Sequence, residues 1–179
     1  YDAREVFLFE CYTGIRISDI LTLKWKHITD EKISIRMRKT EKLLSIPIND
    51  YVRAVLDRRR CAVENNGGKI TSEKYVFNIL KVDVDEVSAQ DALNAISSAT
   101  AVINKQLKKI AKKTGIDKNL STHCARHSYA TALLTNNIPL PVIKEMLGHS
   151  DIKVTQIYAK VVDSKRNEVV ECLNKVYHG

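Results

Sequence analysis

Two segments toward the C-terminal end of the chain carry side chains that could act on a phosphate group. His123 and Arg126 stand three residues apart, and Tyr158 follows His149 by nine residues. A tyrosine hydroxyl has a pKa of about 10, so it is a useful nucleophile only where cations and hydrogen-bond donors stabilise the charge that develops during attack. The histidines and Arg126 are such groups, and Arg16 is a second guanidinium further upstream.

The first of these segments is predicted to lie at a helix N-terminus. Ser121 can cap a helix over residues 122–135, which places His123 and Arg126 on one face of its first turns. Unpaired N–H groups at such an end attract phosphate, and an arginine adds two parallel donors. His127 is interpreted as a structural histidine that is hydrogen-bonded in the core.

A further set of cations lies on a predicted β-hairpin. Between residues 32 and 48 apolar residues alternate with polar ones on both sides of a turn near residues 40–42, which is typical of two antiparallel strands. Lys39 stands near the tip of this hairpin. Its other cations, which are candidate DNA contacts, are Arg36, Arg38 and Lys42.

Helical spacing of apolar residues predicts most of the other elements. Tyr75–Phe77 reads as a short extended segment, and the long helix is expected to bury Leu93, Ile96, Ala99, Ile103, Leu107 and Ile110. The predicted fold class is α+β, mostly helical with a small antiparallel β-sheet. The remaining predicted helices cover residues 2–12, a short stretch from 16, 50–64, 89–114, 139–148, a short stretch after 150, and 164–177.

Composition narrows the class of partner. The chain has 179 residues, enough for one domain with a sizeable core, and its formal net charge of +8 favours a polyanion. Aromatic residues make up 6%, which fits duplex DNA held by its phosphates better than single strands held by base stacking. The four cysteines are scattered, and the sequence shows no secretory signal and no apolar run long enough to cross a bilayer. These features predict a cytoplasmic protein that makes no membrane contact. Because the chain begins at Tyr1, we expect it to be a fragment.

Taken together, the motifs resemble the catalytic domain of the tyrosine recombinases, the phage-integrase-like family. The resemblance rests on Thr-Gly-Ile-Arg-Ile-Ser-Asp at 13–19, His-Cys-Ala-Arg-His at 123–127 and Leu-Gly-His-Ser at 147–150, followed by Tyr158. These occur in the family's order from about Glu5 onward. Ala125 replaces a usual leucine, and Asp19 stands where the family often has glutamate.

The resemblance implies metal-free phosphoryl transfer with no cofactor and no ATP. Tyr158 would be the nucleophile and form a 3′-phosphotyrosyl link, with Lys39 as general acid to the leaving 5′ oxygen. Arg16 and Arg126 would bind the non-bridging oxygens. His149 would donate a further hydrogen bond, and His123 would be the base for the tyrosine proton. Such chemistry serves recombination and integration of DNA, including mobile elements.

The resemblance also implies an organisation. Residues 1–179 would be the catalytic domain, and the family's separate N-terminal DNA-binding domain is not in this chain. The helix over 164–179 would dock on a neighbouring protomer in a tetramer on DNA, and the protein would be a monomer without DNA.

Three alternatives remain open at this point. A type IB topoisomerase uses the same phosphotyrosine to cut and reseal one duplex, and a non-catalytic DNA-binding protein could keep the same fold. A zinc site could be built from His123, Cys124, His127 and His149.

Overall fold

The computed structural model describes residues 2–149, and two compact units divide the chain at residues 129 and 130. The short helix expected after residue 150, the last helix over 164–177 and Tyr158 lie outside the described residues. Among the described residues, the first unit holds seven elements and the start of α5, and the second holds α6 (Leu140–Met146). The elements of the first unit, in chain order, are α1 (Asp2–Thr13), α2 (Ile17–Leu21), η1 (Trp25–His27), β1 (Lys32–Arg36), β2 (Leu43–Pro47), α3 (Asp50–Asn65), α4 (Ala89–Lys113) and α5 (Thr122–Thr135), whose last turns enter the second unit.

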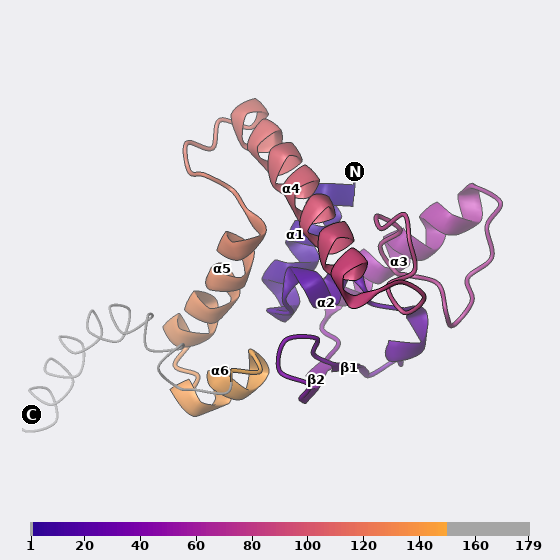
Figure 1. Cartoon of the computed structure of the whole chain (residues 1–179). Helices are drawn as coiled ribbons and strands as arrows, with labels where there is room; N and C mark the ends of the chain where they lie inside the picture. The colour runs from indigo at the N-terminus through magenta and orange to yellow at the C-terminus, as the bar shows by residue number, and fades with distance from the viewer. Residues whose placement is uncertain (1, 150–179) are drawn as a thin grey trace, which may run out of the picture. The chain divides into compact units, whose positions relative to one another are not determined.

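The core of the first unit forms where α2, α3 and α4 pack on α1 (Figure 1). Phe9 of α1 meets Phe77 edge to face, with ring centroids 5.2 Å apart. Phe77 belongs to the extended segment predicted over 75–77. Val76 N–H donates to the Leu23 carbonyl at 2.8 Å, which fastens that segment beside the end of α2. The core therefore holds α1 and α2, the two elements that flank Arg16.

The predicted hairpin is confirmed as a two-stranded antiparallel sheet, β1 paired with β2. Its register pairs Lys32 with Pro47 at one end and Arg36 with Leu43 at the other. The alternation places one face in the core and the other in solvent. The buried side chains of the pair are Ile33, Ile35, Leu44 and Ile46.

The long helix α4 begins and ends within a residue of its predicted bounds, but its inward face was predicted one residue off at its start. Leu93 is 59% exposed, whereas Ala92 is buried. The core-facing positions run Ala92, Ile96, Ile103 and Leu107, and a step of one residue turns a side chain by about 100° around the helix. Ala99 and Ile110 are half-buried at the edge of that face.

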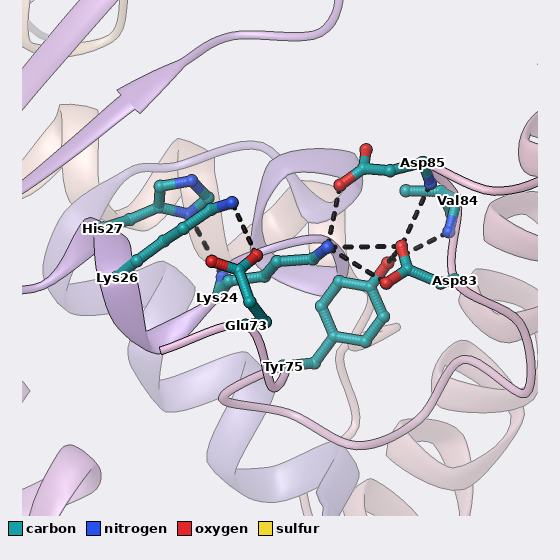
Figure 2. Close-up of polar contacts among 8 residues, drawn as sticks. All are labelled: Lys24, Lys26, His27, Glu73, Tyr75, Asp83, Val84 and Asp85. Carbon is teal, nitrogen blue, oxygen red and sulfur yellow. Dashed lines mark hydrogen bonds and ion pairs between the residues drawn. The ribbon is translucent and has the colours of Figure 1, made fainter. Parts of the chain in front are cut away.

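A buried lysine fastens the loop that precedes α4. Lys24 Nζ forms ion pairs with Asp83 at 3.0 Å and with Asp85 at 2.7 Å, and the hydroxyl of Tyr75 donates to Asp83 at 2.7 Å (Figure 2). The Lys24 side chain is 5% exposed, so its charge is buried but fully paired. The segment around residue 84 is thereby held against η1.

Candidate active site

The turn between α1 and α2 presents Arg16. Gly14 adopts φ +65°, a conformation that glycine reaches without strain, and its N–H donates to the Glu10 carbonyl at 2.8 Å. Arg16 then begins α2, where its carbonyl accepts from the Asp19 and Ile20 N–H groups. Its guanidinium donates to Met37 Sδ at 3.2 Å and remains half-exposed. Arg16 thus lies between α2 and the hairpin, within reach of a ligand.

Arg126 reaches the same turn from α5. Its Nη1 donates to the Gly14 carbonyl, and the residue is 8% exposed. The N-terminus of α5 is fixed as predicted, since Ser121 Oγ and its carbonyl both accept from the Cys124 N–H. Two motifs 112 residues apart in the sequence are therefore joined at one turn.

Asp19 links α2 to the hairpin. Its Oδ1 accepts from the Arg38 N–H at 2.9 Å, while its Oδ2 is buried and receives no hydrogen bond within residues 2–149. Burial raises the pKa of Asp19, although the Arg38 N–H and the charges of Arg16 and Arg126 oppose the rise. The side chain of Asp19 thus fixes the backbone of the hairpin beside Arg16.

Histidines 123 and 127 face each other one turn apart on α5. Their Nε2 atoms are 2.6 Å apart, and the rings meet edge to face. His123 is exposed and His127 is half-buried, so the prediction that His127 lies in the core is wrong. Burial and the nearby charges of His123 and Arg126 lower the pKa of His127. A contact this short needs one proton between the two nitrogens, which leaves the pair able to take up another.

Glu10 is a buried acid that the sequence reasoning missed. It is 2% exposed, and its Oε2 receives no hydrogen bond from the residues that the structure describes. Burial raises the pKa of Glu10 to about 9, opposed by the charge of Arg126. The available signal was its spacing, because residues 3, 6, 10 and 13 follow one buried face of α1.

Lys39 lies in the exposed turn at the hairpin tip. The turn is closed by Glu41 N–H, which donates to the Met37 carbonyl at 2.8 Å, and Glu41 adopts φ 55°. Within residues 2–149 the Lys39 ammonium makes no ion pair or hydrogen bond. The neighbouring cations are also exposed, as predicted, and these are Arg36, Arg38 and Lys42.

His149 lies in the second unit, immediately after α6. Gly148 adopts φ 61° and donates its N–H to the Glu145 carbonyl, while His149 N–H donates to the Lys144 carbonyl at 3.0 Å. This pair of bonds is a Schellman motif, which fixes the backbone of His149 at the helix end. Tyr158 lies outside the described residues.

Residues 2–149 lack two kinds of feature. That part of the chain contains no group of three or more His, Cys, Asp or Glu side chains arranged to hold a metal ion. None of its helices combines the length and apolar character needed to cross a bilayer.

Comparison with known sequences places this geometry in context. The phage integrase family matches residues 1–165. Tyrosine recombinase XerD of Listeria monocytogenes serotype 4b is 48% identical over 160 residues, which cover 88% of this chain and 49% of the relative. The chain thus spans about half the length of that relative.

Solved structures share the fold. XerH site-specific recombinase in a pre-cleavage complex with difH substrate aligns with a TM-score of 0.60 at 25% identity, covering 87% of this chain and 42% of that one. The Tn1549 transposon integrase in complex with circular intermediate DNA aligns with a TM-score of 0.58 at 19% identity, covering 92% and 59%. Matched over nearly its whole length, and with its two arginine motifs joined at one turn, the chain belongs to the phage integrase family.

Proposed function

We propose that this protein is the catalytic domain of a site-specific DNA recombinase that cleaves and rejoins duplex DNA through a 3′-phosphotyrosyl intermediate. The observation that carries the proposal is the hydrogen bond from Arg126 to the Gly14 carbonyl, which brings its guanidinium to the turn that presents Arg16. Two guanidiniums at one turn suit the two non-bridging oxygens of a phosphodiester. Relatives with the same fold are recombinases or integrases, and two of them were solved with DNA or a recombination substrate.

In the proposed reaction the Tyr158 oxygen attacks the scissile phosphorus and the bond to the 5′ oxygen breaks. His123 takes the tyrosine proton, and Lys39 gives a proton to the leaving 5′ hydroxyl. Arg16 and Arg126 stabilise the charge on the non-bridging oxygens. The reverse reaction with another 5′ hydroxyl rejoins the DNA, so the bond energy is conserved without ATP.

The side chains on α5 are suited to their proposed roles. His123 is exposed and paired with His127, so a proton can pass onto this pair from a ligand in solvent. Arg126 is largely buried and its direction is fixed by a main-chain acceptor, which gives the preorganisation that a transition-state contact needs. The exposed hairpin cations would bind DNA phosphates near Lys39.

Assembly forms part of the same proposal. Residues 1–179 would act with a separate N-terminal DNA-binding domain, on double-stranded DNA inside the cell. Recombination would proceed in a tetramer, in which residues 164–179 dock on a neighbouring protomer, and the protein would be monomeric without DNA.

A nicked suicide duplex tests the reaction. The 5′ hydroxyl leaves with a short strand that diffuses away, so the covalent adduct accumulates and its peptide can be mapped. We expect the adduct on Tyr158, in excess chelator, and none with Tyr158→Phe. An adduct on another residue, or a reaction that needs added metal, would refute the assignment.

A further inference from the structure

A small cavity lies close to Arg16, and although two of the hairpin cations named above line it, its side chains on η1 have no role in the reaction proposed above. It measures about 200 Å³ and lies among α2, η1 and β1. The basic side chains that line it are Lys24, Lys26 and His27, at η1, and Arg36 and Arg38, at the end of β1 and just beyond it. Among residues 2–149, the carboxylates that line the cavity are Asp19 and Asp85, which the lysine and arginine side chains outnumber.

Lys24 lines the cavity with an ammonium group that stays charged. Burial lowers the pKa of Lys24, but hydrogen bonds to Asp85 and Asp83 raise it further than burial lowers it. Asp83 is itself held ionised, because hydrogen bonds from Tyr75 and the Asp85 N–H lower its pKa to about 2. Figure 2 shows the Lys24 amine pointing between the two carboxylates. Asp85 therefore presents a paired oxygen to the cavity.

The side chains of η1 form one wall of the cavity. His27 Nδ1 accepts from the Lys24 N–H at 3.1 Å, so in the neutral ring Nε2 carries the proton. Burial and the charges of Lys26 and Lys24 lower the pKa of His27, which favours that neutral form. Lys26 pairs with Glu73 at 2.7 Å, but both side chains are exposed, and exposed pairs contribute little. Lys26 can therefore exchange Glu73 for another anion.

The opposite wall adjoins the candidate active site. Arg38 binds Asp19 through its backbone N–H, and its guanidinium makes no hydrogen bond with residues 2–149. Asp19 would oppose an anion if it were ionised. Burial raises its pKa, which weakens that opposition.

We propose that this cavity is a second phosphate site, which takes the DNA backbone phosphate next to the one that is cleaved. The inference rests on the proposed function, because it takes the cleaved phosphate to lie at Arg16 and Arg126. Asp19, whose N–H donates to the Arg16 carbonyl, lines the cavity together with Arg38, so a strand bound at Arg16 can continue along this wall. Two held phosphates fix the position of the strand, and hence which phosphate meets the nucleophile.

Methylphosphonate scanning tests the site, since each substitution removes one backbone charge at a known position. Binding is measured with the full chain carrying Tyr158→Phe. We expect one phosphate beside the scissile position whose neutralisation weakens binding about tenfold. In the Lys26→Met, His27→Phe double variant the same substitution should cost about twofold or less, since the two donors on η1 no longer bind that phosphate.

Three comparisons make the result decisive. Lys26→Arg should keep the tenfold effect, and Lys69→Met, an exposed lysine that does not line the cavity, should leave the whole scan unchanged. Thermal unfolding shows whether each variant is folded, and the single Lys26→Met variant serves if the double variant is not. If neutralising each phosphate costs the same in the variants as in the parent, the site does not exist.

The scan also separates this inference from the proposed function. Binding is measured without cleavage. If one phosphate loses its effect on binding in the double variant, but the parent protein forms no covalent adduct, the phosphate site stands and the recombinase assignment falls. If the adduct forms on Tyr158 but no phosphate loses its effect on binding in the double variant, the recombinase assignment stands and the phosphate site falls.

Discussion

Glu10→Gln should stabilise the protein at neutral pH, even though it replaces a buried side chain beside a candidate catalytic arginine. Burial raises the pKa of Glu10 from 4.5 to about 9. Between those values the unfolded chain has released the proton and the folded chain still holds it. The contribution of Glu10 to stability is therefore complete below pH 4.5 and is lost as pH rises toward about 9.

The size of the effect follows from that interval. From pH 4.5 to pH 7 is an interval of 2.5 pH units, and each unit lowers the free energy of unfolding by about 1.4 kcal/mol. The total loss of stability at pH 7 is therefore about 3 kcal/mol. Glutamine has the same shape and is neutral at every pH, so it avoids this cost. We expect Glu10→Gln to raise the free energy of unfolding by up to about 3 kcal/mol at pH 7, and to change it little at pH 4.5.

Urea unfolding followed by circular dichroism between pH 5 and pH 8 measures the difference. Glu5→Gln is the matched control on the same helix, because Glu5 is equally buried but accepts from Arg4 and Arg58 at 2.9 Å. It should destabilise by about 1–3 kcal/mol, since it breaks charged hydrogen bonds. Parallel stability curves for Glu10→Gln and the parent would show that Glu10 is ionised in the folded protein, and would refute the reasoning.

Three further outcomes follow from the same structure. Arg126→Lys keeps the charge but not the two parallel donors of the guanidinium, so it should lose about 3 kcal/mol of transition-state stabilisation. In single-turnover assays this is a loss of more than a hundredfold in rate, with a much smaller loss in DNA affinity. Equal losses in rate and affinity would show that Arg126 only anchors a phosphate. Lys24→Met should destabilise by about 2 kcal/mol and open the loop near Asp83 and Asp85 to limited proteolysis, and a loop as resistant as in the parent would contradict its anchoring role. Removal of residues 164–179 should leave a folded protein that cleaves suicide duplex but no longer recombines in the full-length context, and undiminished recombination would exclude exchange between protomers.

Local patterns predicted most of the fold. The period of two predicted the hairpin, and Ser121 marked the start of α5, as the structure confirms. Hydrogen bonds between side chains distant in sequence could not be predicted this way. Lys24 and Asp83 are 59 residues apart, and nothing in the spacing of either pointed to the other.

The candidate site shows the same division. Order and spacing identified Arg16 and Arg126 as members of one site, but not the main-chain carbonyl that links them. His127 was interpreted as a core histidine, whereas its ring is half-buried and contacts His123. Glu10 escaped notice because pattern reasoning expects an acid to be exposed, and only packing shows which acids are not.

The Gly14 carbonyl has a consequence for how this family can vary. An acceptor on the main chain survives every side-chain substitution, so random mutation cannot delete the accepting end of the bond to Arg126. It can only displace it, by changing the path of the backbone. Gly14 holds that path at φ +65°, a value that other residues adopt at a cost of about 1–2 kcal/mol. Its neighbours Thr13 and Ile15 are fully buried, so the backbone path at this turn depends on their packing as well as on the glycine, and a methyl group added at position 14 would carry that cost.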